Sequence, residues 1–143
     1  MNMRFWLAAV LALTLLGSGQ ASAKTLVLSV ALSGQNEAPP NGATATGFAE
    51  ASYDDVTRTL TWHVTYQGLT GPLVAAHIHG PAEPGSNAGI IFEFDPIEIS
   101  PIDGSATLTE QQAADLLAGL LYVNLHTAAH PGGEIRGNLT VND

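Results

Sequence analysis

The chain contains 143 residues, no cysteine, and a formal net charge of −9 that arises from 13 acidic and 4 basic side chains. Its length fits one domain with a single hydrophobic core. The lack of cysteine excludes disulfides, iron–sulfur clusters and cysteine zinc fingers, and the negative charge argues against binding to nucleic-acid phosphates. The 15 glycines and 8 prolines indicate a turn-rich chain of the β class.

The first 23 residues have the three parts of a secretory signal peptide. Arg4 supplies a positive charge, residues 5–16 are almost entirely apolar, and Ala21-Ser22-Ala23 forms an A-x-A cleavage signal. This apolar run is shorter than the roughly 20 residues that a membrane-spanning helix needs. We therefore expect cleavage after Ala23, with an uncleaved N-terminal anchor as the alternative.

The expected mature chain, residues 24–143, forms one domain that is periplasmic or secreted and has no membrane span. Without Arg4 it has three basic and 13 acidic side chains, a formal net charge of −10. Small exported domains usually rely on disulfides, which this chain cannot form. Its fold must instead be stabilised by a good core, a partner subunit or a metal ion.

Short runs of alternating apolar and polar residues, separated by turns rich in glycine and proline, predict about eight strands. The clearest alternation lies between Leu60 and Tyr66, where every second residue is apolar. The expected strands cover residues 26–32, 43–53, 60–66, 74–79, 89–94, 104–108, 121–126 and 134–141. Many short strands with frequent turns are typical of an antiparallel sandwich or barrel.

One short helix is predicted over residues 109–118, between the strands expected at residues 104–108 and 121–126. Thr109 and Gln112 have the spacing of a capping box, and Gly119 is suited to end the helix in a left-handed conformation. We expect this helix to cover one mouth or edge of the sheet, and we assign no chemistry to it.

The His77-Ile78-His79 motif places two imidazoles on one face of a predicted strand. Alternate strand residues face the same side, roughly 6.5–7 Å apart, so Ile78 points into the core and both histidines point outward. Two imidazoles at this spacing can converge on one ion through nitrogen–metal bonds of about 2 Å. The alternative interpretation is an exposed H-x-H strand that binds no metal.

A second histidine pair, His126 and His130, lies at the end of the strand predicted over residues 121–126 and in the loop after it. The odd-numbered positions of that strand are apolar, so His126 is expected on the face away from the core. We predict one metal site formed by His77, His79, His126 and His130. Imidazole ligands without thiolate suit copper(II) or zinc, with nickel as a further alternative.

Other polar residues have no settled role at this point. His63 is expected to be an exposed strand residue, and no role is assigned to Glu37. Arg136 either pairs with Glu134 or another acid, or guides an anion toward a metal. A cluster of acidic residues is expected to form a solvated face: Glu83, Glu93, Asp95 and Glu98.

Three stretches resemble the CHRD (chordin-type) domain: Leu32–Pro40, Ala76–Ala82 and Leu121–Gly137. The resemblance covers nearly all of residues 25–141, and the last stretch is the longest and most specific. The family is known from exported bacterial proteins and, as a repeated extracellular module, from chordin. The resemblance therefore implies a single exported domain, and it places Glu37 within a family motif.

A more distant resemblance is to copper/zinc superoxide dismutase. There, as at Gly68-Leu69 here, a turn leads into an H-x-H strand, and a late strand ends in a ligand histidine, as at His126. This resemblance implies an antiparallel Greek-key β-sandwich with copper on its outer face, and it matches His77, His79 and His126 to copper ligands. Five histidines are too few for a paired copper–zinc centre, so a single-metal site is expected, with His130 as the candidate fourth ligand.

Three functions stay open, and the sequence favours the first. The chain is expected to be an exported protein that binds one copper or zinc ion. The alternatives are a non-catalytic interaction module, with a homodimer or another protein as partner, and a copper-only dismutase-like enzyme. A superoxide enzyme benefits from a positive field, which a formal net charge of −10 opposes, and we assign no catalytic residue.

Overall fold

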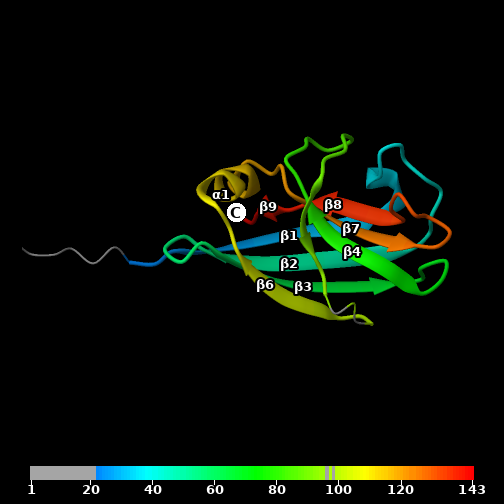
Figure 1. Ribbon diagram of the computed structural model, residues 1–143, viewed down its shortest axis with the longest axis horizontal. Coiled ribbons are helices and arrows are strands. Elements are labelled where there is room, and N and C mark those ends of the chain that lie inside the picture. Colours follow the sequence, from blue (N-terminus) through cyan, green and yellow to red (C-terminus); the bar gives the residue numbers. More distant parts are fainter. Residues whose placement is uncertain (1–21, 96, 98) are drawn as a thin grey trace, which may run out of the picture.

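The computed structural model describes residues 22–95, 97 and 99–143, and it confirms an all-β fold with one short helix. The predicted signal peptide lies outside the described residues except for Ser22 and Ala23. Figure 1 shows the strands as one curved sheet, with the helix at one end. The elements are β1 (Thr25–Ser33), the 3-10 helix η1 (Gly34–Asn36), β2 (Thr46–Asp54), β3 (Thr59–Gln67), β4 (Leu73–His79), β5 (Ile90–Glu93), β6 (Ile102–Thr107), α1 (Glu110–Leu117), β7 (Tyr122–Thr127), β8 (Ile135–Asn138) and β9 (Thr140–Val141).

The nine strands belong to one antiparallel sheet that curls until its two edges approach each other. The strand order is β5-β4-β7-β8-β1-β2-β3-β6, and β9 pairs with β1 beside this path. Between the two edge strands, β5 and β6, the indole of Trp62 in β3 stacks on the ring of Phe92 in β5, with the ring centroids 6.4 Å apart, and on the ring of Phe94, with the centroids 4.9 Å apart. Aromatic stacking therefore holds edge strand β5 against the β3–β6 side, and the sheet is nearly closed, as the predicted sandwich or barrel requires.

The single strand predicted over residues 134–141 is two strands in the structure. β8 pairs with β7 and, through one residue pair, with β1, whereas β9 pairs with β1 at Leu28 and Ser29. Between them the backbone N–H of Leu139 donates to Leu121 O, and the Leu139 side chain is fully buried. The strand is interrupted at Leu139, which is buried in the core, because the chain changes its pairing partner there from β7 to β1.

The helix begins and ends where the sequence predicts. Thr109 and Gln112 form the expected capping box, and Gly119 follows the C-cap with a φ of 75°, which lies in the left-handed region. Leu116 is fully buried and joins the hydrophobic core. Burial of this apolar side seals one end of the curved sheet (Figure 1). Among the described helices, none is both long and apolar enough to cross a membrane.

The inner face of the sheet carries the core, and the outer face of β7 is also covered. Ile78, Val123, Leu125 and Ile135 point inward and are fully buried. The alternation predicts His126 on the face away from the core, and this is confirmed, because the core cluster contains Val123 and Leu125 of this strand and not His126. Every residue of β7 is nevertheless buried, since loops 80–89 and 128–133 fold over the outer face, where they accept hydrogen bonds from β7 side chains.

Candidate metal centre

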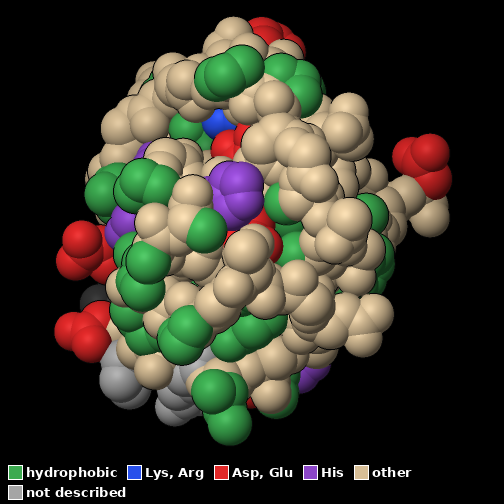
Figure 2. Space-filling model, turned by 90° about the vertical axis from the view of Figure 1, so that its right-hand side faces the viewer, with side chains coloured by type: hydrophobic (Ala, Val, Ile, Leu, Met, Phe, Trp, Pro, Cys, Tyr) green, Lys and Arg blue, Asp and Glu red, His purple; other side chains and the backbone are tan. Residues whose placement is uncertain are grey.

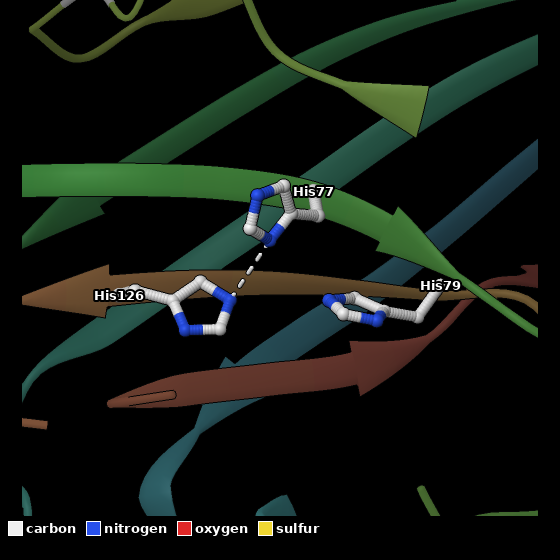
Figure 3. Close-up of side chains that lie close together, drawn as sticks. All are labelled: His77, His79 and His126. Carbon is white, nitrogen blue, oxygen red and sulfur yellow. Dashed lines mark hydrogen bonds between the residues drawn. The ribbon is translucent and has the colours of Figure 1, made fainter. Parts of the chain in front are cut away.

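Three of the four predicted ligands meet on the outer face of two neighbouring strands. His77 and His79 come from β4 and His126 comes from β7, which pairs with β4. One ligand nitrogen from each histidine lies within 4.8 Å of the other two, and His77 Nδ1 is 3.0 Å from His126 Nε2 (Figure 3). The alternation in β4 therefore places both of its histidines on one side, as predicted, and the strand order brings His126 to them.

Backbone carbonyls from the two covering loops orient two of the imidazoles. Nδ1 of His126 donates to Pro131 O at 3.0 Å, and Nδ1 of His79 donates to Ala88 O at 3.0 Å. Because Nδ1 carries the hydrogen in both rings, each Nε2 is unprotonated and can bind a metal. In the structure Nε2 of His126 accepts from Nδ1 of His77 at 3.0 Å, a hydrogen bond that a bound ion would replace. Nε2 of His79 is buried and has no hydrogen-bond partner among the described residues.

The ring of His79 is further held by an aromatic stack. The centroids of the His79 and Tyr122 rings lie 4.9 Å apart, and the two rings are almost parallel, at an interplanar angle of 4°. The guanidinium carbon of Arg136 lies 4.6 Å from the centroid of the Tyr122 ring. The Tyr122 hydroxyl accepts from Ala88 N at 3.1 Å and donates to Ala88 O at 3.3 Å. The carbonyl that orients His79 is thus itself positioned by the tyrosine beneath that ring.

Burial keeps the three imidazoles neutral. Desolvation lowers the pKa of each of His77, His79 and His126 below the usual value. The charge of Glu93 partly opposes this effect at His77, whereas Arg136 adds to it at His79. Neutral imidazoles present unprotonated nitrogens at neutral pH, which is the state that binds metal ions.

The donor set fits a borderline transition-metal ion. Three imidazole nitrogens are available, with no thiolate anywhere in the chain, and such sites suit copper, zinc or nickel. The buried, unpartnered nitrogen of His79 points to the same conclusion, since an ion would supply the missing interaction. Figure 2 shows acidic and histidine side chains on the face that it displays, with only a small recessed area of basic side chain.

His130 lies outside this group of converging nitrogens. It is half-buried in the turn after β7, where its backbone N–H donates to Thr127 O at 3.1 Å. Its charge acts on Glu134, whose pKa it helps to lower. The structure therefore assembles three of the predicted ligands and leaves the fourth in the turn between β7 and β8.

His63 is exposed, as expected, and lies in a different part of the sheet. Its Nδ1 is 2.6 Å from a carboxylate oxygen of Asp103 in β6. It faces Glu50 in β2 on its other side. His63 therefore serves as a natural control for experiments on the three converging histidines.

A buried polar network beside the histidines went unrecognised in the sequence. Nε of Arg136 donates to Asn36 O at 2.7 Å and lies 3.7 Å from a carboxylate oxygen of Glu37, while Nη1 donates to Asn87 Oδ1 at 3.0 Å. The acid beside Arg136 is thus Glu37, not its strand neighbour Glu134. The sequence signals were the place of Glu37 in a family motif and its position as the single acid of the segment 32–40. Neither signal identifies Arg136 as its neighbour, because contacts between residues about 100 positions apart leave no local pattern.

Comparison with known proteins gives one match. A family model described as the CHRD domain matches residues 28–139, which is most of the chain. No curated protein and no solved structure matches the chain.

Proposed function

The chain belongs to the CHRD domain family, and on that premise we propose that it is an exported protein that binds a single transition-metal ion through His77, His79 and His126. Copper is the favoured ion and zinc the alternative. CHRD domains occur in extracellular and secreted proteins, and the signal-peptide pattern of residues 1–23 supports export to the periplasm or beyond.

The observation that carries the proposal is the convergence of three neutral imidazoles, each with one ring nitrogen within 4.8 Å of the other two. In a tetrahedral site with bonds of 2.0–2.1 Å, ligand nitrogens lie about 3.3 Å apart. The nitrogens here lie between 3.0 Å and 4.8 Å apart, so rotation of the side chains suffices to enclose an ion. Two of the three rings already have the tautomer that such an ion needs.

Copper is favoured over zinc on the chemistry of the donor set. Nitrogen ligands bind copper(II) more tightly than other divalent first-row ions. The expected mature chain has neither cysteine nor methionine, since both methionines lie before residue 24. A soft sulfur ligand for the site is thereby excluded within residues 24–143.

The test is thermal unfolding of the mature protein with copper(II), with zinc, and with a chelator. An ion that binds only the folded state at 100 times its dissociation constant stabilises it by about 2.7 kcal/mol, which raises the melting temperature by several degrees. We expect this rise for the wild type and for His63→Ala, and its loss in His79→Ala and His126→Ala.

Calorimetric titration supplies a second readout for any variant that is too unstable to melt cleanly. We expect one ion per wild-type chain and no saturable binding in His79→Ala. An unchanged wild-type melting temperature at saturating copper and zinc, with no heat of binding, would refute the proposed function.

A further inference from the structure

Glu93 lies directly opposite one of the three converging histidines. In the antiparallel pair of β4 and β5, the register matches His77 with Glu93, so both side chains project from the same outer face. Side chains that are paired in this way have Cβ atoms about 4.5–5.5 Å apart. The side chain of Glu93 therefore starts next to that of His77, on the face of the sheet where the three imidazoles converge.

Glu93 is also free to move toward the three imidazoles. Its side chain is exposed at the end of the edge strand β5, and it makes no hydrogen bond or ion pair with the other described residues. Rotation about the side-chain bonds of Glu93 needs no change in the backbone or in the covering loops.

Three imidazoles leave one position open on a four-coordinate ion. A carboxylate oxygen can fill it at 2.0–2.2 Å, and such a ligand offsets part of the charge of a divalent cation. We propose that Glu93 is the fourth, anionic ligand of the histidine centre, and that the centre therefore takes a divalent ion, copper(II) or zinc(II), in preference to copper(I). This inference rests on the proposed function above.

The rest of the chain agrees with a divalent ion. Copper(I) is a soft ion that is best served by thiolate and thioether ligands, and residues 24–143 contain no sulfur. Neither His130 nor Glu93 belongs to the group of ligand atoms within 4.8 Å of one another. Glu93 is favoured for the fourth position because it pairs directly with His77 across β4 and β5, whereas His130 lies in the turn after β7.

The experiment compares Glu93→Gln with the matched control Glu50→Gln. Both glutamates are exposed strand residues opposite a histidine, His77 for Glu93 and His63 for Glu50, and both substitutions remove one negative charge. Affinities for copper(II), zinc(II) and copper(I) are measured by competition with chelators on the mature protein. Electron paramagnetic resonance of the copper(II) form reports whether an oxygen ligand is replaced.

We expect Glu93→Gln to weaken copper(II) and zinc(II) binding by about tenfold or more and to alter the copper(II) spectrum. Copper(I) binding should stay within about twofold of the wild type, and Glu50→Gln should match the wild type throughout. Equal effects of the two substitutions on affinity, with an unchanged spectrum, would overturn the assignment of Glu93. Wild-type protein that binds only copper(I) would overturn the inference and leave the proposed function intact, whereas protein that binds no ion would overturn both.

Discussion

Glu37 is a carboxyl group in an almost water-free position, with only 5% of its surface exposed. Burial raises the pKa of Glu37 to about 7, although Arg136 and a hydrogen bond from Asn124 lower it. One carboxyl oxygen accepts from Asn124 Nδ2 at 3.3 Å. The other oxygen and Asn124 Oδ1 have no partner, and both lie within 2.6 Å of the position that a Cβ on Gly133 would occupy. Protonation of Glu37 removes the buried negative charge and makes one carboxyl oxygen a hydrogen-bond donor.

This raised pKa predicts a pH dependence of stability. Between about pH 4.5 and 7 the folded protein holds a proton on Glu37 that the unfolded chain has lost, so the free energy of unfolding decreases as the pH rises through this window. The full effect is about 3 kcal/mol, and it is complete above pH 7. In Glu37→Gln the side-chain amide donates at every pH, and this contribution disappears.

Urea unfolding of the wild type and of Glu37→Gln at pH 5, 6, 7 and 8 checks this prediction. The difference between the two proteins is the relevant quantity, because the histidines contribute equally to both. We expect the variant to gain stability relative to the wild type as the pH rises. Parallel curves across the range would show that Glu37 ionises as an ordinary surface carboxyl does.

At the scale of elements, a second buried carboxylate joins a loop to a strand. Glu134 is fully buried and accepts hydrogen bonds from the backbone N–H of Thr70 at 2.8 Å, the Thr70 hydroxyl at 2.7 Å and the Thr127 hydroxyl at 2.5 Å. Burial alone would raise the pKa of Glu134, but these hydrogen bonds outweigh it and hold the pKa below its usual value. The loop before β4 is thereby attached to the end of β7.

Glu134→Gln is expected to destabilise the protein by about 1–3 kcal/mol at neutral pH, because an amide nitrogen then faces groups that donate. The stability that the ionised Glu134 contributes is present above the usual carboxyl pKa and is lost as the pH falls through its lowered pKa. Chemical denaturation at pH 7 and pH 3 measures both effects. Glu83→Gln, at an exposed position, is the control. If Glu134→Gln is as stable as this control at pH 7, the hydrogen bonds of Glu134 do not stabilise the fold as proposed.

At the scale of the whole molecule, the sheet order determines which residues can share a ligand. β7 lies next to β4 although β5, β6 and α1 come between them in the chain. An ion held by both strands would link their outer faces and stabilise the whole fold through its binding free energy. The high negative charge favours the approach of cations over anions.

The proposed export concerns the whole chain, and it is directly measurable. We expect the protein, when it is produced with its own N-terminus in a bacterium, to be recovered outside the cytoplasm and to begin at Lys24. Intact-mass measurement and N-terminal sequencing of the periplasmic and culture fractions identify the cleavage site. Full-length protein that stays with the membrane would indicate an uncleaved anchor, and replacement of Ala23 by a bulky residue should produce that outcome.

Features that depend on neighbouring residues could be predicted from the sequence. Alternation places Ile78 in the core with His77 and His79 together on the other face, and the capping box locates the start of α1. The motifs at residues 32–40, 76–82 and 121–137 point to the CHRD family, which the match over residues 28–139 confirms. These features are local because strand alternation and helix capping need only a few successive residues.

Tertiary structure alone decided what surrounds those residues. Which strand lies beside β4 and which acid lies beside Arg136 depend on contacts across 49 to 100 positions of the chain. The burial of His126 to 8% exposure also depends on how the loop that follows β7 folds back over it. Strand pairing and loop closure at such separations follow from the packing of the whole core, and no local pattern encodes them. The sequence by itself therefore determined which histidines are candidate ligands and the face they occupy, while the folded sheet decided that three of them meet around one point and that the fourth does not.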